Sequence, residues 1–183
     1  MRLAPLFALL VLSGTPCALP AQGDDLAAAR TALRAGDLAT AASAIDRHLV
    51  AKPADERARF LKGVILSEQG RTDEAFTVFF ALTQDHPELA EPYNNIAVIY
   101  AARGEYERAR DALQNAIRAN PDYAVAYANL GDVYARLAAR AYEKALGLDA
   151  GDRTLRAKLA AARELATTTP GRAAGSPPAT SPR

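Results

Sequence analysis

Histidine and cysteine, which often perform acid–base, nucleophilic or metal chemistry, are rare in this chain. The only histidines are His48 and His86, and the only cysteine is Cys17. A catalytic or metal site needs such a group beside a second base or ligand on the same face of an element. Apart from Asp85 next to His86, neither histidine has a candidate ligand at that spacing, and no glycine-rich phosphate loop or paired cysteine motif is present. We therefore expect no enzymatic activity, no metal site and no cofactor.

The elements that would position a binding site recur along the chain with a fixed period of 34 residues. Four columns share this register: Gly36, Gly70 and Gly104; Ala41, Ala75 and Ala109; Ile45, Phe79 and Leu113; and Pro53, Pro87 and Pro121. Self-similarity at one period is the signature of a repeat architecture. Glycine suits the left-handed position that ends a helix, alanine admits a close neighbouring helix, and proline closes the unit. Each unit therefore predicts a helix, a tight turn, a second helix and a linker.

This pattern resembles the tetratricopeptide repeat, which has a 34-residue period and small, aromatic and proline positions at these spacings. The third unit carries it best, with Tyr93, Ile96, Ala97, Tyr100, Ala109, Leu113, Ala116 and Pro121, and the fourth begins with Tyr127, Leu130, Gly131 and Tyr134. The resemblance implies an all-α, right-handed α-solenoid of helix pairs. We place this domain at residues 22–166, with units at about 22–55, 56–89, 90–123 and 124–150.

The fourth unit departs from the period. A glycine is expected at position 138 and a proline at 155, but the chain has Ala138 and Leu155. Apolar residues recur at steps of three and four from Tyr123 to Leu148, which predicts that the unit is fused into one long helix. A C-terminal helix at 152–166 is expected to cover its second half. The other interpretation is self-association through the residues that this half would otherwise expose, Tyr142, Leu146 and Leu148.

The resemblance also implies a concave groove, lined by the first helix of each unit, that receives a peptide or a partner helix. The candidate groove residues are Arg57, Phe60 and Val64 from the second unit, Asn94, Asn95 and Val98 from the third, and Asn129, Asp132 and Arg136 from the fourth. An asparagine amide both donates to and accepts from a peptide backbone. The alternative for Asn95 and Asn129 is a bond within the repeat. We expect a periplasmic adaptor or scaffold that binds a protein partner of unknown identity; the alternative is a structural envelope protein that self-associates through the helix at 123–148.

The two ends of the chain have a different composition. Arg2, the apolar run 3–12 and the small residues before position 22 are typical of a cleaved secretory signal peptide, placed at 1–21, although an uncleaved anchor is the alternative. Pro16 before Cys17 argues against lipidation. The apolar run is too short for a membrane span, and a net charge of +1 gives no footprint for nucleic acid. Residues 167–183 are rich in proline and lack apolar periodicity, which predicts a disordered tail.

Overall fold

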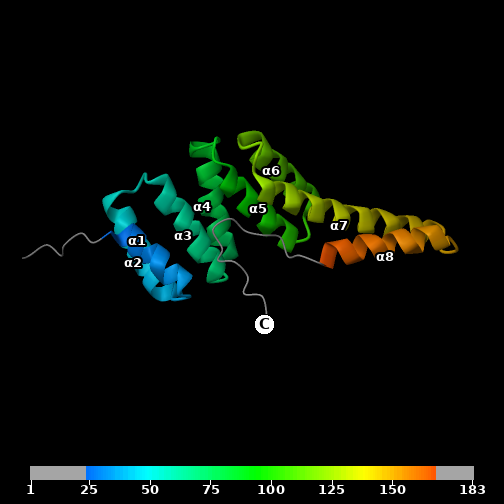
Figure 1. Ribbon diagram of the computed structural model, residues 1–183, viewed down its shortest axis with the longest axis horizontal. Helices are drawn as coiled ribbons and strands as arrows, with labels where there is room; N and C mark the ends of the chain where they lie inside the picture. The colour runs from blue at the N-terminus through cyan, green and yellow to red at the C-terminus, as the bar shows by residue number, and fades with distance from the viewer. Residues whose placement is uncertain (1–23, 168–183) are drawn as a thin grey trace, which may run out of the picture.

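The computed structural model describes residues 24–167, which form eight α-helices and no β-strand. The helices are α1 (Asp25–Arg34), α2 (Leu38–Ala51), α3 (Glu56–Glu68), α4 (Thr72–Asp85), α5 (Ala90–Ala102), α6 (Tyr106–Ala119), α7 (Ala124–Leu148) and α8 (Arg153–Thr167). The predicted signal peptide and, apart from Thr167, the predicted tail lie outside the described residues. Each of the first six helices pairs with its neighbour in sequence, and the pairs stack side by side (Figure 1). We call the first helix of a pair the A helix and the second the B helix.

The turn inside each regular pair depends on its glycine. Gly36, Gly70 and Gly104 have φ angles of 76°, 73° and 75°, the left-handed region that only glycine enters without strain. The amide of each glycine donates to a carbonyl of the last turn of the preceding A helix. The turns predicted from the glycine column are therefore confirmed.

The core lies between the A and B helices and between successive pairs. The repeated alanines Ala41, Ala75 and Ala109 are completely buried, as is Phe79, and Ile45 and Leu113 are 1% exposed. Small residues allow the backbones of neighbouring helices to approach, and the larger residue one turn later fills the space beside them. The columns found in the sequence are thus the columns of the core.

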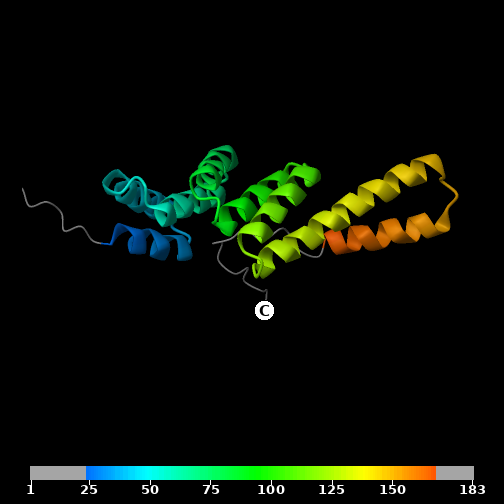
Figure 2. The same cartoon turned by 90° about the horizontal axis from the view of Figure 1, so that it is seen from above.

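The fourth unit has the predicted fused helix. α7 runs for 25 residues without a break, and the chain reverses at Ala150 and Gly151 into α8, which packs antiparallel along the second half of α7 (Figure 2). Tyr142 and Leu146 are partly buried, whereas Leu148 is 86% exposed. α8 therefore covers most of the surface through which self-association was considered.

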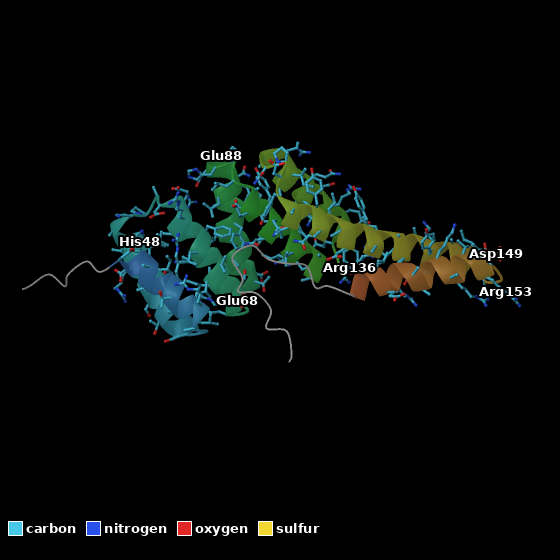
Figure 3. The ribbon with its side chains drawn as sticks, viewed as in Figure 1. His48, Glu68, Glu88, Arg136, Asp149 and Arg153 are labelled. Atoms are coloured by element: carbon cyan, nitrogen blue, oxygen red, sulfur yellow. The ribbon has the colours of Figure 1, made fainter. Side chains whose placement is uncertain are left out.

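Two arginines attach α7 to its neighbours. The Arg140 guanidinium lies 4.3 Å from the centre of the Tyr106 ring and donates to the Gly104 carbonyl at 2.6 Å. Arg136, one turn earlier, also lies over Tyr106, at 5.7 Å, and donates to the Ala166 carbonyl at 2.9 Å. Figure 3 shows Arg136 beside the C-terminal end of α8, so α8 ends level with the middle of α7.

Candidate binding groove

A hollow lies between α1, α3 and the start of α5, and we call it the N-terminal groove. It has a volume of about 600 Å³. Its lining consists of Arg30, Leu33, Arg34, Glu56, Arg57, Phe60, Leu61, Leu89, Glu91 and Pro92. The first helices of three successive pairs contribute to it because the 34-residue period places equivalent faces side by side. A hollow built in this way suits a segment of another polypeptide, since both apolar and charged residues line it.

The charges of the N-terminal groove come from exposed side chains. Among the described residues, none of Arg30, Arg34 and Arg57 forms an ion pair, and Arg34 donates only to the Thr31 hydroxyl, at 3.3 Å. Elsewhere in the structure most arginines have a carboxylate partner, as Arg59 has in Asp85. The groove therefore presents guanidinium groups whose donors are open to a ligand.

The predicted groove residues divide into separate groups in the structure. Arg57 and Phe60 line the N-terminal groove as expected. Val64, one turn further along α3, is only 2% exposed and belongs to the core. Its assignment to the groove surface was wrong because the A helix packs most of its face against other helices at this point.

The prediction that the asparagines present their amides to a ligand was also wrong. Asn94 is completely buried and Asn95 is 3% exposed, so neither presents its amide to a ligand. Asn129 is 4% exposed, and its amide nitrogen donates to the Asn94 side-chain oxygen at 2.8 Å. A buried polar side chain must be hydrogen-bonded to avoid a desolvation cost, and these two satisfy each other across successive A helices. The bond joins two repeats and does not lie within one.

A second, smaller hollow lies between the end of α5, the start of α6 and the middle of α7. It has a volume of about 320 Å³ and includes four predicted residues, Val98, Asn129, Asp132 and Arg136, in its lining. Burial raises the pKa of the Asp132 carboxyl, and the positive charge of Arg136 opposes that shift. Because Arg136 is already engaged with Tyr106 and Ala166, this hollow holds a packed cluster and offers fewer open donors than the N-terminal groove.

Sequence reasoning missed the contribution of α1 to the groove. Arg30, Leu33 and Arg34 line it, and none of them was among the predicted groove residues. The sequence does contain a pattern that indicates this contribution. Arg30 and Arg34 are four residues apart and therefore lie on one helix face, with Leu33 beside them.

The histidines have structural surroundings. His48, at the C-terminal end of α2 (Figure 3), lies 2.8 Å through its Nε2 from a carboxylate oxygen of Asp55. The other oxygen of Asp55 accepts from the Ala58 amide and caps α3. Burial alone would raise the pKa of Asp55, but the His48 contact and the Ala58 amide outweigh it and lower the pKa. Within residues 24–167, no three metal-binding side chains cluster, and none of the helices is long and apolar enough to cross a membrane.

Comparison with known families identifies the repeat. A tetratricopeptide-repeat model matches residues 26–89, and a second model of the same repeat matches residues 99–137. The chain belongs to the tetratricopeptide-repeat family. The second match ends at Leu137, directly before the point at which this chain lacks the regular turn of a tetratricopeptide repeat. No curated protein matches the chain.

Several solved protein structures resemble this fold. The MamA protein is 25% identical with a TM-score of 0.57, and the match covers 78% of this chain and 80% of MamA. An O-GlcNAc transferase mutant from Thermobaculum terrenum is 28% identical over 63% of this chain, with a TM-score of 0.56, and the match spans only 22% of that enzyme. A tetratricopeptide-repeat protein from Parabacteroides merdae, 21% identical with a TM-score of 0.57, shares the fold over 78% of this chain and 59% of its own. Repeats and neighbours together support a protein–protein interaction adaptor in general.

Proposed function

We propose that the chain is an exported adaptor that binds a segment of a partner protein in the N-terminal groove. The observation that carries this proposal is the combination of an apolar floor with three arginines that have no carboxylate partner among the described residues. The apolar part of the lining consists of Leu33, Phe60, Leu61, Leu89 and Pro92. Of these, the partly exposed Phe60 and Leu89 provide the contact area, and the arginines provide the directional donors.

The charges of the groove define the kind of segment that fits it. Arginines outnumber the carboxylates of Glu56 and Glu91 by three to two, so the groove is positive overall. A segment with a bulky apolar residue next to aspartate or glutamate would bury its apolar side chain on Phe60 and pair its carboxylate with Arg57 or Arg30. Complementary charge at such a rim chiefly sets specificity and the rate of association.

A peptide-display selection against the folded chain tests the proposal. The unmodified protein is expected to enrich peptides with an apolar residue flanked by acidic residues. The double variant Arg30→Glu/Arg57→Glu is expected to lose these peptides, with at least a tenfold weaker affinity for the best of them, on the order of 1.4 kcal/mol.

The matched control is Arg153→Glu/Lys158→Glu, which changes the net charge equally on α8, away from the groove (Figure 3). This control should enrich the same peptides as the unmodified protein. Peptides without an acidic preference, or peptides that bind both double variants equally, would show that the groove is not the binding site.

Export is the second component of the proposal, and it rests on the signal-like sequence of residues 1–21. Expression of the full chain in a bacterial host, followed by fractionation and intact mass measurement, checks it. The mature protein is expected in the periplasm with its first residue near Gln22. A lipid-modified chain that begins at Cys17, or an uncleaved chain, would contradict this expectation.

A further inference from the structure

The fourth repeat has an A helix without a B helix at the usual place. In the third pair, the A helix begins at Ala90 and the turn to the B helix contains Gly104. The equivalent turn of the fourth repeat would lie at position 138, but the chain turns back only at Gly151. At about 1.5 Å per residue, the turn is displaced along α7 by roughly 20 Å. That is the length of a whole B helix such as α4 or α6. α8 therefore packs beside the second half of α7 and leaves the first half without a B helix.

The side chains that would contact the B helix are still present on this first half. Tyr127 is 50% exposed and Tyr134 is 47% exposed, and no atom lies within 4 Å of the place where a Cβ of Gly131 would stand. We call these three residues the uncovered α7 face. They lie on one side of the helix because they are spaced by four and three residues.

The third repeat shows how the same positions look when a B helix is present. Tyr93 and Tyr100, which correspond to Tyr127 and Tyr134, are partly buried. The guanidinium of Arg108, from the B helix α6, lies 5.5 Å from the centre of the Tyr100 ring. The exposure of the two tyrosines in the fourth repeat thus follows from the displaced B helix.

The second repeat shows what fits over the glycine. Gly63 occupies the repeat position of Gly131, and a Cβ there would lie only 2.5 Å from Cε1 of Phe79. Phe79 belongs to the B helix α4 and is completely buried, so the missing side chain of Gly63 makes room for its ring. Gly131 offers the same room, and no described residue fills it.

Within residues 24–167, no other helix takes the missing place. α8 is held in its displaced position by Arg136, which binds the Ala166 carbonyl. Residues 168–183 contain only threonine, proline, glycine, arginine, alanine and serine. None of these residue types provides a large apolar side chain for the space over Gly131.

We propose that the uncovered α7 face binds an amphipathic helix of a partner protein that has the pattern of this chain's own B helices. That pattern is an alanine followed four residues later by a large apolar residue, as in Ala75 and Phe79. Such a helix would continue the A–B interface of the three preceding pairs, with its aromatic residue over Gly131 and its flanks against Tyr127 and Tyr134. This site is separate from the N-terminal groove and does not depend on its proposed role.

A peptide with the sequence of residues 71–87 is the probe, because it contains α4 with Ala75 and Phe79 and contains no tyrosine. The chain has no tryptophan, so its tyrosine fluorescence reports on peptide binding. Saturable binding is expected, and the same peptide with Phe79→Ala should bind at least tenfold more weakly. In the protein, Gly131→Leu fills the space over the glycine and should also weaken binding at least tenfold. This variant should remain folded because residue 131 is exposed and no atom lies within 4 Å of its Cβ position.

A second measurement avoids the cost of ordering a free peptide. The sequence of residues 71–87 is added after Arg183, so that residues 168–183 act as a linker and the effective concentration rises to about the millimolar range. The added helix should raise the Tm of the protein, and Gly131→Leu should abolish the increase. Equal peptide binding by both proteins, or no increase in Tm, would refute the proposal. A concentration-dependent dimer in sedimentation that Gly131→Leu converts to a monomer would also refute it, because the occupant would then be a second copy of the chain.

Discussion

Replacing the same repeat position by alanine is expected to have opposite effects in two repeats. Gly63→Ala places a Cβ 2.5, 2.8 and 3.0 Å from three carbons of the Phe79 ring, well inside the normal carbon–carbon contact of about 3.5–4.0 Å. Phe79 cannot move freely because it is fully buried and packs against Phe60 at a centroid distance of 5.6 Å. Overpacking costs about 1–3 kcal/mol, and the better helix propensity of alanine returns about 1 kcal/mol. The net result is a loss of up to about 2 kcal/mol.

Gly131→Ala should instead stabilise the protein. Nothing lies within 4 Å of the added methyl group, so only the helix propensity changes, by about 0.8–1.0 kcal/mol in favour of the folded state. Thermal unfolding followed by circular dichroism should show a Tm increase of about 3 °C for Gly131→Ala and a decrease of up to about 6 °C for Gly63→Ala. Urea unfolding with unchanged m values would confirm that stability alone has changed. The reasoning is refuted if Gly131→Ala destabilises the chain, since a helix would then already cover that face.

Three further variants test individual contacts. Asp55→Asn should lower the free energy of unfolding at neutral pH, because the carboxylate that faces His48 is removed. The lowered pKa of Asp55 stabilises the fold only while this carboxylate is ionised, so the difference in unfolding free energy between variant and unmodified protein should shrink as the pH falls below about 4. Urea unfolding across the pH range measures this difference. Asn129→Leu should cost about 1–3 kcal/mol in the same assay by removing the donor to the buried side chain of Asn94. Arg140→Ala should speed amide hydrogen exchange in the second half of α7 more than in α3, because its contacts hold that half to the preceding pair.

The helices of this fold were predictable because they depend on local chemistry that repeats. The turn glycines are needed for a left-handed backbone, so their spacing marks the ends of the A helices. The fused helix was predictable for the opposite reason. Residues 137–141 contain nothing that favours a turn, and the apolar positions continue through them, so α7 was expected from Tyr123 to Leu148 and was observed from Ala124 to Leu148.

The groove was less predictable because a residue's repeat position does not determine how closely the next pair approaches it. Val64, Asn94 and Asn95 lie on the A helices where a groove was expected, yet neighbouring helices bury them. The bond between Asn129 and Asn94 spans 35 residues, one more than the period, so comparison of equivalent positions did not reveal it. Pairing of two side chains across a stack depends on the rotation between repeats, which sequence spacing does not specify.

The displaced turn leaves the proposed adaptor with a different kind of surface at each end. Its N-terminal groove is charged and is built from α1, α3 and α5, whereas the uncovered α7 face is apolar, with a space over Gly131 that selects by shape. No residue belongs to both surfaces, so a ligand at one has no direct contact through which to favour or oppose a ligand at the other. A regular fourth pair would have closed the second surface with its own B helix. The extension of α7 therefore exchanges a self-contained end of the solenoid for a second, chemically distinct place to hold a partner.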